Sequence, residues 1–144
     1  MGRYVDLGAA RLWYEEQGDG EPLVLLHGGL GDGRLFHDNL VALADRFRVL
    51  RVDLRGHGRS PDQPGPLGPP QLADDLVAFL DKVVGGPVAL AGYSLGAVTA
   101  LLAASRRPDL VRRLVLISAV YHRDGWLLPP STTGGGPPVL ARLY

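Results

Sequence analysis

The residues best suited to chemistry lie at Gly92–Gly96, which read Gly-Tyr-Ser-Leu-Gly and form the pattern G-x-S-x-G. A short apolar run, residues 87–91, precedes the pattern, and an Ala- and Leu-rich segment, residues 97–105, follows it. This context predicts a sharp turn from a buried strand into a helix, in which the serine has a strained backbone and an exposed hydroxyl. Ser94 is therefore a candidate nucleophile for acyl transfer, and an ordinary Gly-rich turn is the alternative.

A second turn could stabilise the negative charge that such a reaction creates. His27, Gly28 and Gly29 directly follow the apolar run 22–26. The N–H of Gly29 and that of Leu95, at the start of the predicted helix, could converge as an oxyanion hole. We interpret His27 as a structural residue of the turn, because a histidine beside two glycines at a strand end more often hydrogen-bonds to its own loop.

These two turns must be positioned by strands and helices that alternate along the chain. Short apolar or alternating runs predict strands, and apolar residues at helical spacing predict helices. The predicted strands are 4–6, 12–16, 22–26, 48–54, 87–91 and 111–119, and the predicted helices are 35–43, 71–84 and 97–105. The first two strands should form a hairpin at the sheet edge. The whole pattern predicts an α/β fold, with a mostly parallel sheet and flanking helices.

Composition excludes several other classes of protein. The 144 residues fit one domain, and 15 basic against 15 acidic side chains offer no positive field for nucleic acid or an anionic membrane. The lack of cysteine excludes disulfides, thiolate metal sites and cysteine nucleophiles, and we expect no cofactor and no metal. Charges at the N-terminus argue against a signal peptide, so we expect a cytoplasmic protein. Residues 83–105 carry no charge, but their glycines and proline argue against a membrane span.

Three segments together resemble the α/β-hydrolase family. They are the HGG turn at 27–29, the DLRGHGRS loop at 53–60 and the GYSLG turn at 92–96, and they match in order and spacing. The resemblance covers residues 4–126. It implies a serine hydrolase acting on an ester, lactone, amide or similar small acyl substrate through an acyl-enzyme, with Ser94 as the nucleophile. It also implies that the N–H groups of Gly29 and Leu95 form the oxyanion hole.

The chain departs from the family pattern after Ser94. In that family a histidine base and an acidic partner follow the serine, and the histidine lies after a final strand. Here His122 is the one histidine after Ser94, and its loop would have to fold back over the serine. Asp124 lies where some members place the acid. We therefore expect a truncated form, the amino-terminal half of such a hydrolase without the late histidine, which makes its activity doubtful.

In this interpretation residues 1–126 form the core, with a sheet that stops after about the sixth strand, and residues 127–144 form a Pro/Gly-rich disordered tail. The edge of the sheet at Leu114–Ile117 would be exposed, and we expect self-association through it. A second interpretation is a hydrolase-like binding module without turnover. A third is a dinucleotide-binding unit, but G-x-G-x-x-G would need a glycine where Arg34 stands.

Overall fold

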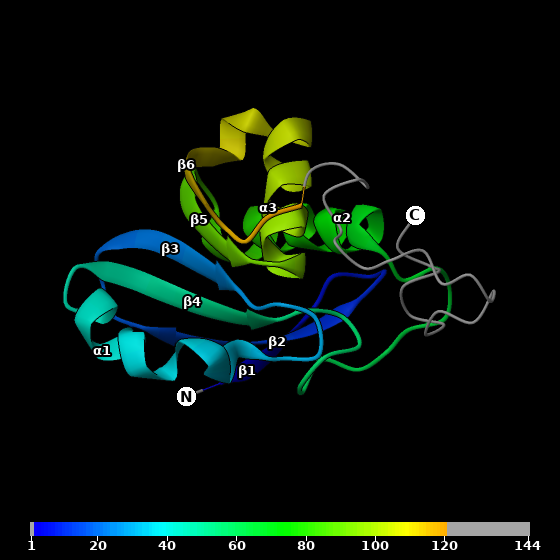
Figure 1. Cartoon of the computed structure of the whole chain (residues 1–144), viewed down its shortest axis with the longest axis horizontal. Helices are drawn as coiled ribbons and strands as arrows, with labels where there is room; N and C mark the ends of the chain where they lie inside the picture. Colours follow the sequence, from blue (N-terminus) through cyan, green and yellow to red (C-terminus); the bar gives the residue numbers. More distant parts are fainter. Residues whose placement is uncertain (1, 121–144) are drawn as a thin grey trace.

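A computed structural model describes residues 2–120 of the chain (Figure 1). Its six strands form one sheet in the order β1-β2-β4-β3-β5-β6. The strands are β1 (Arg3–Asp6), β2 (Arg11–Gln17), β3 (Glu21–Leu26), β4 (Phe47–Asp53), β5 (Val88–Tyr93) and β6 (Val111–Ile117). The β1–β2 and β2–β4 pairs are antiparallel, whereas β3–β4, β3–β5 and β5–β6 are parallel. The predicted α/β class, the mostly parallel sheet and the edge hairpin are therefore confirmed.

Helices cover both faces of the sheet. A short 3-10 turn, η1 (Gly33–Phe36), leads into α1 (His37–Ala44), and α1 lies on the opposite face from α2 (Pro69–Phe79) and α3 (Leu95–Arg106) (Figure 1). A π-helical turn, η2 (Leu80–Val84), extends α2, and a 3-10 turn, η3 (Pro108–Leu110), connects α3 to β6. The sheet therefore lies between two helical layers. In such sheets the loops at the carboxyl ends of the parallel strands usually form the binding site.

Alternation along the strands separates two buried clusters. On β3, Val24 and Leu26 join the larger cluster under α2 and α3, whereas Leu23 and Leu25 pack with Leu40 of α1. Successive side chains of a strand point to opposite faces, so a strand buried on both faces reads as a continuous apolar run. That rule explains why residues 22–26 contain no polar side chain.

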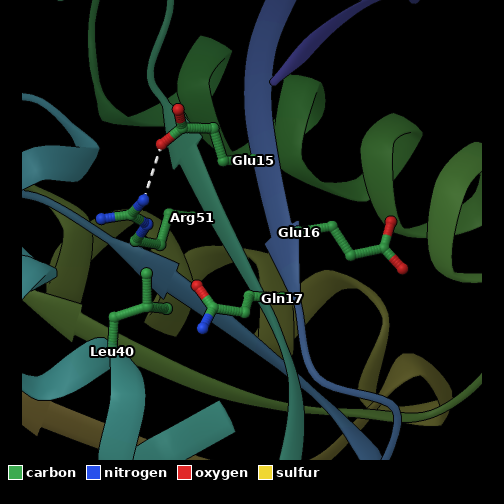
Figure 2. A pocket seen from close by; sticks show the side chains of 5 residues that line it. All are labelled: Glu15, Glu16, Gln17, Leu40 and Arg51. Atoms are coloured by element: carbon green, nitrogen blue, oxygen red, sulfur yellow. Dashed lines mark hydrogen bonds and ion pairs between the residues drawn. The ribbon is translucent and has the colours of Figure 1, made fainter. Parts of the chain in front are cut away.

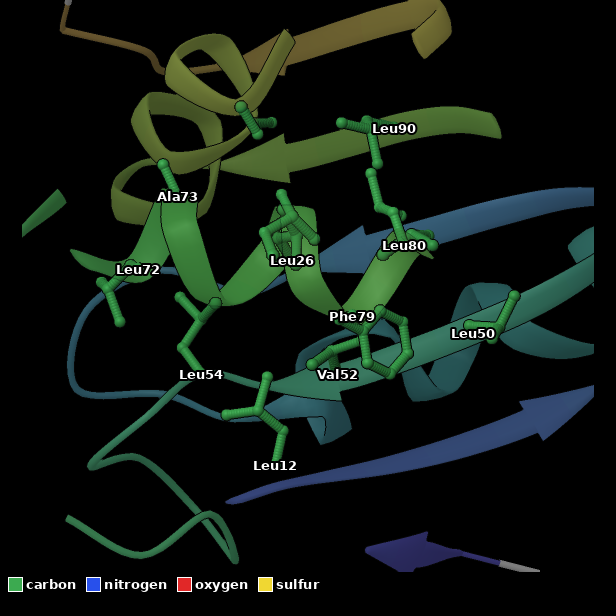
Figure 3. Close-up of a cluster of buried hydrophobic side chains, with 14 of the residues drawn as sticks. Leu12, Leu26, Leu50, Val52, Leu54, Leu72, Ala73, Phe79, Leu80 and Leu90 are labelled. Atoms are coloured by element: carbon green, nitrogen blue, oxygen red, sulfur yellow. The ribbon is translucent and has the colours of Figure 1, made fainter. Parts of the chain in front are cut away.

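The larger cluster fixes α2 against the sheet. Figure 3 shows Phe79 of this helix next to Val52 of β4, with Leu12 of β2 beyond Val52. The Phe79 ring meets the Tyr14 ring edge to face, with 5.2 Å between the centroids. Phe79 is fully buried, and burial of one such side chain contributes about 1.5–3 kcal/mol. The helix is therefore held by packing more than by its own propensity.

The element boundaries differ from the predicted ones where proline and the serine turn are involved. Helix α2 begins at Pro69, two residues before the predicted start, because proline is well tolerated in the first turn of a helix. Strand β5 continues to Tyr93, and α3 begins at Leu95, so one residue separates strand and helix. No helix within residues 2–120 is long and apolar enough to span a membrane.

Strand β6 is an edge of the sheet within the described residues. It pairs with β5 on one side, and no described strand pairs with its other side. Val115, Leu116 and Ile117 are 53%, 38% and 46% exposed. A regular edge with apolar side chains offers unpaired backbone groups to another chain.

We expect the purified chain to self-associate through this edge, and light scattering checks it. Val115→Lys should shift the distribution towards the monomer, because a lysine on an edge strand opposes pairing. Val41→Lys is the matched control, since Val41 is 66% exposed but lies on α1. A monodisperse monomer for the unmodified chain would contradict the expectation.

The predicted tail, residues 127–144, lies outside the described residues.

Candidate active site

Ser94 occupies the single position between β5 and α3. Its backbone is strained, with φ 50° and ψ −112°, a combination that L residues other than glycine rarely adopt. The Ser94 N–H donates to the Ile117 carbonyl of β6 at 2.9 Å, and its own carbonyl accepts from the N–H groups of Ala97 and Val98. Hydrogen bonds on both sides therefore hold the strained residue in place.

The two glycines of the serine turn are required by close backbone contacts. A Cβ atom on Gly92 would overlap the Gly96 carbonyl, and a Cβ atom on Gly96 would overlap the carbonyls of Leu26 and His27. Both overlaps involve backbone atoms, which cannot move aside as a flexible side chain could. The spacing G-x-S-x-G is thus a consequence of packing a helix start directly over the end of β3.

The turn Gly28–Gly31 lies beside the serine. A Cβ atom on Gly28 would lie 3.4 Å from the Ser94 Cβ, and one on Gly29 would lie 3.8 Å from a methyl of Leu95. The Gly31 N–H donates to the Gly28 carbonyl at 3.3 Å, which closes the turn. The structure therefore brings together the three predicted site residues Ser94, Gly29 and Leu95.

The start of α3 adds a favourable field at the same place. This helix has 12 residues and begins at Leu95, directly after the serine. The N–H groups in the first turn of a helix have no partner within the helix, and the helix dipole makes this end partially positive. A negative charge placed next to Ser94 would be stabilised by this arrangement.

His27 is fully buried and both of its ring nitrogens are used by the backbone. Its Nε2 accepts the Leu54 N–H at 2.9 Å, and its Nδ1 pairs with the Gly28 carbonyl at 2.7 Å. Nδ1 must then carry the proton, so the ring is neutral. Burial lowers the pKa of His27, which agrees with this assignment. His27 therefore ties β3 to the end of β4, in the structural role that its position in the sequence suggested.

The carboxylate of Asp53 connects two loops at the end of β4. Its Oδ1 accepts the Gly33 N–H at 2.8 Å, and its Oδ2 accepts the Arg59 N–H at 2.9 Å and the Arg59 Nε–H at 2.8 Å. Asp53 has no exposed surface. Burial acts to raise the pKa of this carboxyl, but the Arg59 guanidinium and the two N–H groups hold it below its ordinary value.

In the sequence the DLRGHGRS loop served only as part of the family resemblance, and Asp53 had no predicted role of its own. The sequence feature that could have pointed to Asp53 is the alternation of glycines in this loop. Gly58 has φ 53°, and a Cβ atom there would overlap the Asp53 carboxylate. Ser60 completes the loop, because its Oγ–H donates to the Asp53 carbonyl at 2.6 Å and its Oγ oxygen accepts the Trp13 N–H at 2.7 Å. The loop is thus wrapped around one buried aspartate.

A separate cavity of about 90 Å³ lies beside β2, β4 and α1. Figure 2 shows Arg51 donating to Glu15, with Gln17 and Leu40 on the same side and Glu16 pointing away. The Nε and one Nη of Arg51 are buried and have no partner in the described part of the chain. Strand β3 separates this cavity from β5 and the serine, so it does not belong to the site at Ser94.

The predicted base and acid cannot be placed. His122 and Asp124 lie outside the described residues, so their assignments stay predictions. Within residues 2–120 no group of three or more His, Asp or Glu side chains is arranged to hold a metal ion. The chemistry that the described residues offer is a strained serine at the start of α3, with the turn Gly28–Gly31 beside it.

Replacement of His27 by phenylalanine should lower the free energy of unfolding by about 1–3 kcal/mol at pH 8, because the buried Leu54 N–H loses its acceptor. The folded pKa of His27 is lowered, so the unfolded state binds more protons below about pH 6.5 and the wild-type chain loses stability there. The difference between wild type and His27→Phe should narrow from pH 8 to pH 5.5 in urea unfolding. The control His37→Phe, at an exposed position, should match the wild type.

Asp53→Asn should cost about 2 kcal/mol in the same unfolding measurement at pH 7, because bonds from a guanidinium to a carboxylate are stronger than those to an amide. Asp62→Asn is the matched control, since Asp62 is an exposed carboxylate in the same long loop. Equal stability of the two variants would show that Asp53 does not hold the loops together.

The comparisons with known proteins agree with this geometry. The family model of the alpha/beta hydrolase fold matches residues 21–135. A 2-(acetamidomethylene)succinate hydrolase from Mesorhizobium japonicum is 35% identical over 117 residues, which are 81% of this chain and 42% of that protein. An sn-1-specific diacylglycerol lipase from Danio rerio is 37% identical over 106 residues, which are 72% of this chain and 33% of that protein.

A solved structure is similar as well. The thermophilic esterase of Thermogutta terrifontis superposes with a TM-score of 0.76 at 30% identity, over 83% of this chain and 46% of that chain. This chain therefore spans less than half the length of these relatives. The resemblance that the three sequence segments carried is confirmed over most of the chain, and the chain belongs to the alpha/beta hydrolase fold family.

Proposed function

We propose that this chain carries the nucleophile half of a serine hydrolase that acts on an ester, amide or similar acyl substrate. The observation that carries the proposal is the strained backbone of Ser94 at the start of α3, with Gly29 and Leu95 beside it. A strained backbone conformation that neighbouring hydrogen bonds hold in place is typical of functional positions. The strain costs free energy, and the surrounding structure supplies it in order to orient a reactive group.

In the proposed reaction the Ser94 oxygen attacks the substrate carbonyl carbon and the C=O π bond opens. The oxygen that gains the charge accepts hydrogen bonds from the N–H groups of Gly29 and Leu95. Collapse of the tetrahedral intermediate expels the alcohol or amine and leaves an acyl group on Ser94, and attack by water then releases the acid. Two such donors typically contribute a factor of about 10²–10³ each.

The reaction also needs an acceptor for the hydroxyl proton. His27 cannot supply it, because its Nε2 accepts the Leu54 N–H and its Nδ1–H donates to Gly28. Protonation of Nε2 would break a buried hydrogen bond. The proton acceptor must therefore be another group, and the family places a histidine after Ser94 in the chain. His122 is the one histidine of this sequence in that position.

The names of the relatives support the class of substrate. One relative hydrolyses 2-(acetamidomethylene)succinate, and another is a diacylglycerol lipase. A similar solved structure is an esterase. These names cover acyl substrates with both nitrogen and oxygen leaving groups, and we extend only this shared feature to the chain.

A hydrolase-like binding module without turnover is the second candidate. The observation that favours it is the full engagement of His27, which leaves the described site with a nucleophile and donors but no base. Such a module would bind an acyl compound at the same turns. The two candidates differ in one property, which is whether Ser94 forms a covalent bond.

Hydrolysis of p-nitrophenyl acetate by the full chain and by Ser94→Ala tests the proposal. We expect the activity above background to disappear in Ser94→Ala, because removal of a nucleophile abolishes the acyl-enzyme route. Ser105→Ala is the matched control, since that serine lies on α3 with its hydroxyl bonded to the Leu101 carbonyl. Equal background rates for all three folded proteins would favour the binding module.

A further inference from the structure

Tyr93, the residue directly before the serine, lies against the turn that faces the serine. A Cβ atom on Gly28 would be 2.8 Å from Cδ1 and 3.0 Å from Cε1 of the Tyr93 ring. Such distances leave no room for a side chain at residue 28, so the backbone of Gly28 rests directly on the ring. Tyr93 follows Ala89 and Ala91 on the face of β5 that packs on the smaller cluster. The ring therefore continues this row of side chains to the end of the strand.

The residue directly after the serine meets the turn less closely. A Cβ atom on Gly29 would lie 3.8 Å from a methyl of Leu95, which is an ordinary van der Waals distance. A methyl group could thus be added between Gly29 and Leu95 but not between Gly28 and Tyr93. The contact with the Tyr93 ring is therefore the one that can fix the position of the turn.

The hydrogen bonds of the turn are too few to fix it alone. The Gly28 carbonyl accepts from His27 Nδ1 at 2.7 Å and from the Gly31 N–H at 3.3 Å. The second distance exceeds the usual range of about 2.7–3.2 Å, so this bond closes the turn weakly. Leu30 inside the turn has φ 63°, which is strained for a leucine. Strain of this kind persists only where the surroundings hold the backbone, and the Tyr93 ring supplies that support.

We propose that Tyr93 is a positioning residue, whose ring fixes the Gly29 N–H relative to Ser94. The proposal rests on the proposed function, in which this N–H donates to the oxygen that gains charge. Such a donor acts only if it is aimed at that oxygen, and a misplacement of about 1 Å can cost a factor of about 100 in rate. The contact is made by ring carbons, so the proposal requires the ring of Tyr93 and not its hydroxyl.

Backbone ¹⁵N relaxation of the full chain, labelled with ¹⁵N-glycine, tests the proposal without turnover. In Tyr93→Ala we expect the order parameter of the Gly29 N–H to fall from about 0.85 to below about 0.6, and in Tyr93→Phe to stay at the wild-type value. Gly29→Ala assigns the signal. Gly65, in an exposed loop with φ 119°, is the internal control. An unchanged order parameter in Tyr93→Ala, or an equal fall in Tyr93→Phe or at Gly65, overturns the proposal.

A double-mutant cycle tests the contact from the other side. The φ of Gly28 is not positive, so an alanine there is opposed by the overlap with the ring and not by its backbone conformation. Gly28→Ala should lower kcat for p-nitrophenyl acetate about tenfold or more with little change in KM, because a displaced donor acts on the transition state. In the Tyr93→Ala background the same methyl has room and should cost nothing further. Equal losses from Gly28→Ala in both backgrounds contradict the proposal.

Two variants separate this inference from the proposed function. Tyr93→Ala should lose kcat as Gly28→Ala does, whereas Tyr93→Phe and the control Tyr4→Ala, at a tyrosine of similar exposure on β1, should keep it. Hydrolysis that depends on Ser94 but is unchanged in Tyr93→Ala would refute the positioning role and leave the proposed function standing. If hydrolysis is independent of Ser94, the proposed function fails, and the order parameters still decide whether Tyr93 holds the turn.

Discussion

The buried carboxylate of Asp53 is the interaction on which the other loops of this structure depend. It lies at the carboxyl end of the central strand β4 and accepts N–H groups from Gly33 on one side and Arg59 on the other. A buried charge is tolerated only with such partners, so the carboxylate and both loops must be ordered together. The DLRGHGRS loop and the turn beside the serine are therefore parts of one arrangement.

A second connection makes the arrangement rigid. His27 links the end of β3 to Leu54, one residue after Asp53, through a hydrogen bond that needs a neutral ring. Farther out, the buried pair Arg55–Asp75 ties the same loop to α2, with the Arg55 Nε 2.8 Å from an Asp75 oxygen. Burial raises the pKa of Asp75, and the Arg55 guanidinium opposes that shift. Three successive residues, Asp53, Leu54 and Arg55, thus fasten the loop to η1, to the end of β3 and to α2.

Most of the fold could be predicted because hydrophobic periodicity and glycine placement both follow from local geometry. The serine turn was predictable since Gly92 and Gly96 are demanded by backbone contacts that any such turn requires. The role of Asp53 could not be predicted, because a carboxylate at a strand end gives no sign of which distant N–H groups it accepts. The strain at Leu30 was equally hidden, since a leucine between glycines does not reveal its φ.

The hydrogen bond from the Ser94 N–H to the Ile117 carbonyl has a consequence for how the site responds to motion. It makes the serine the last rung of the ladder between β5 and β6, so the amide that closes this ladder belongs to the same residue as the reactive hydroxyl. Fraying of β6 at its carboxyl end would release the strained backbone of the serine first. The orientation of the Ser94 hydroxyl therefore depends on the pairing of β6 with β5, and a loss of this pairing changes that orientation.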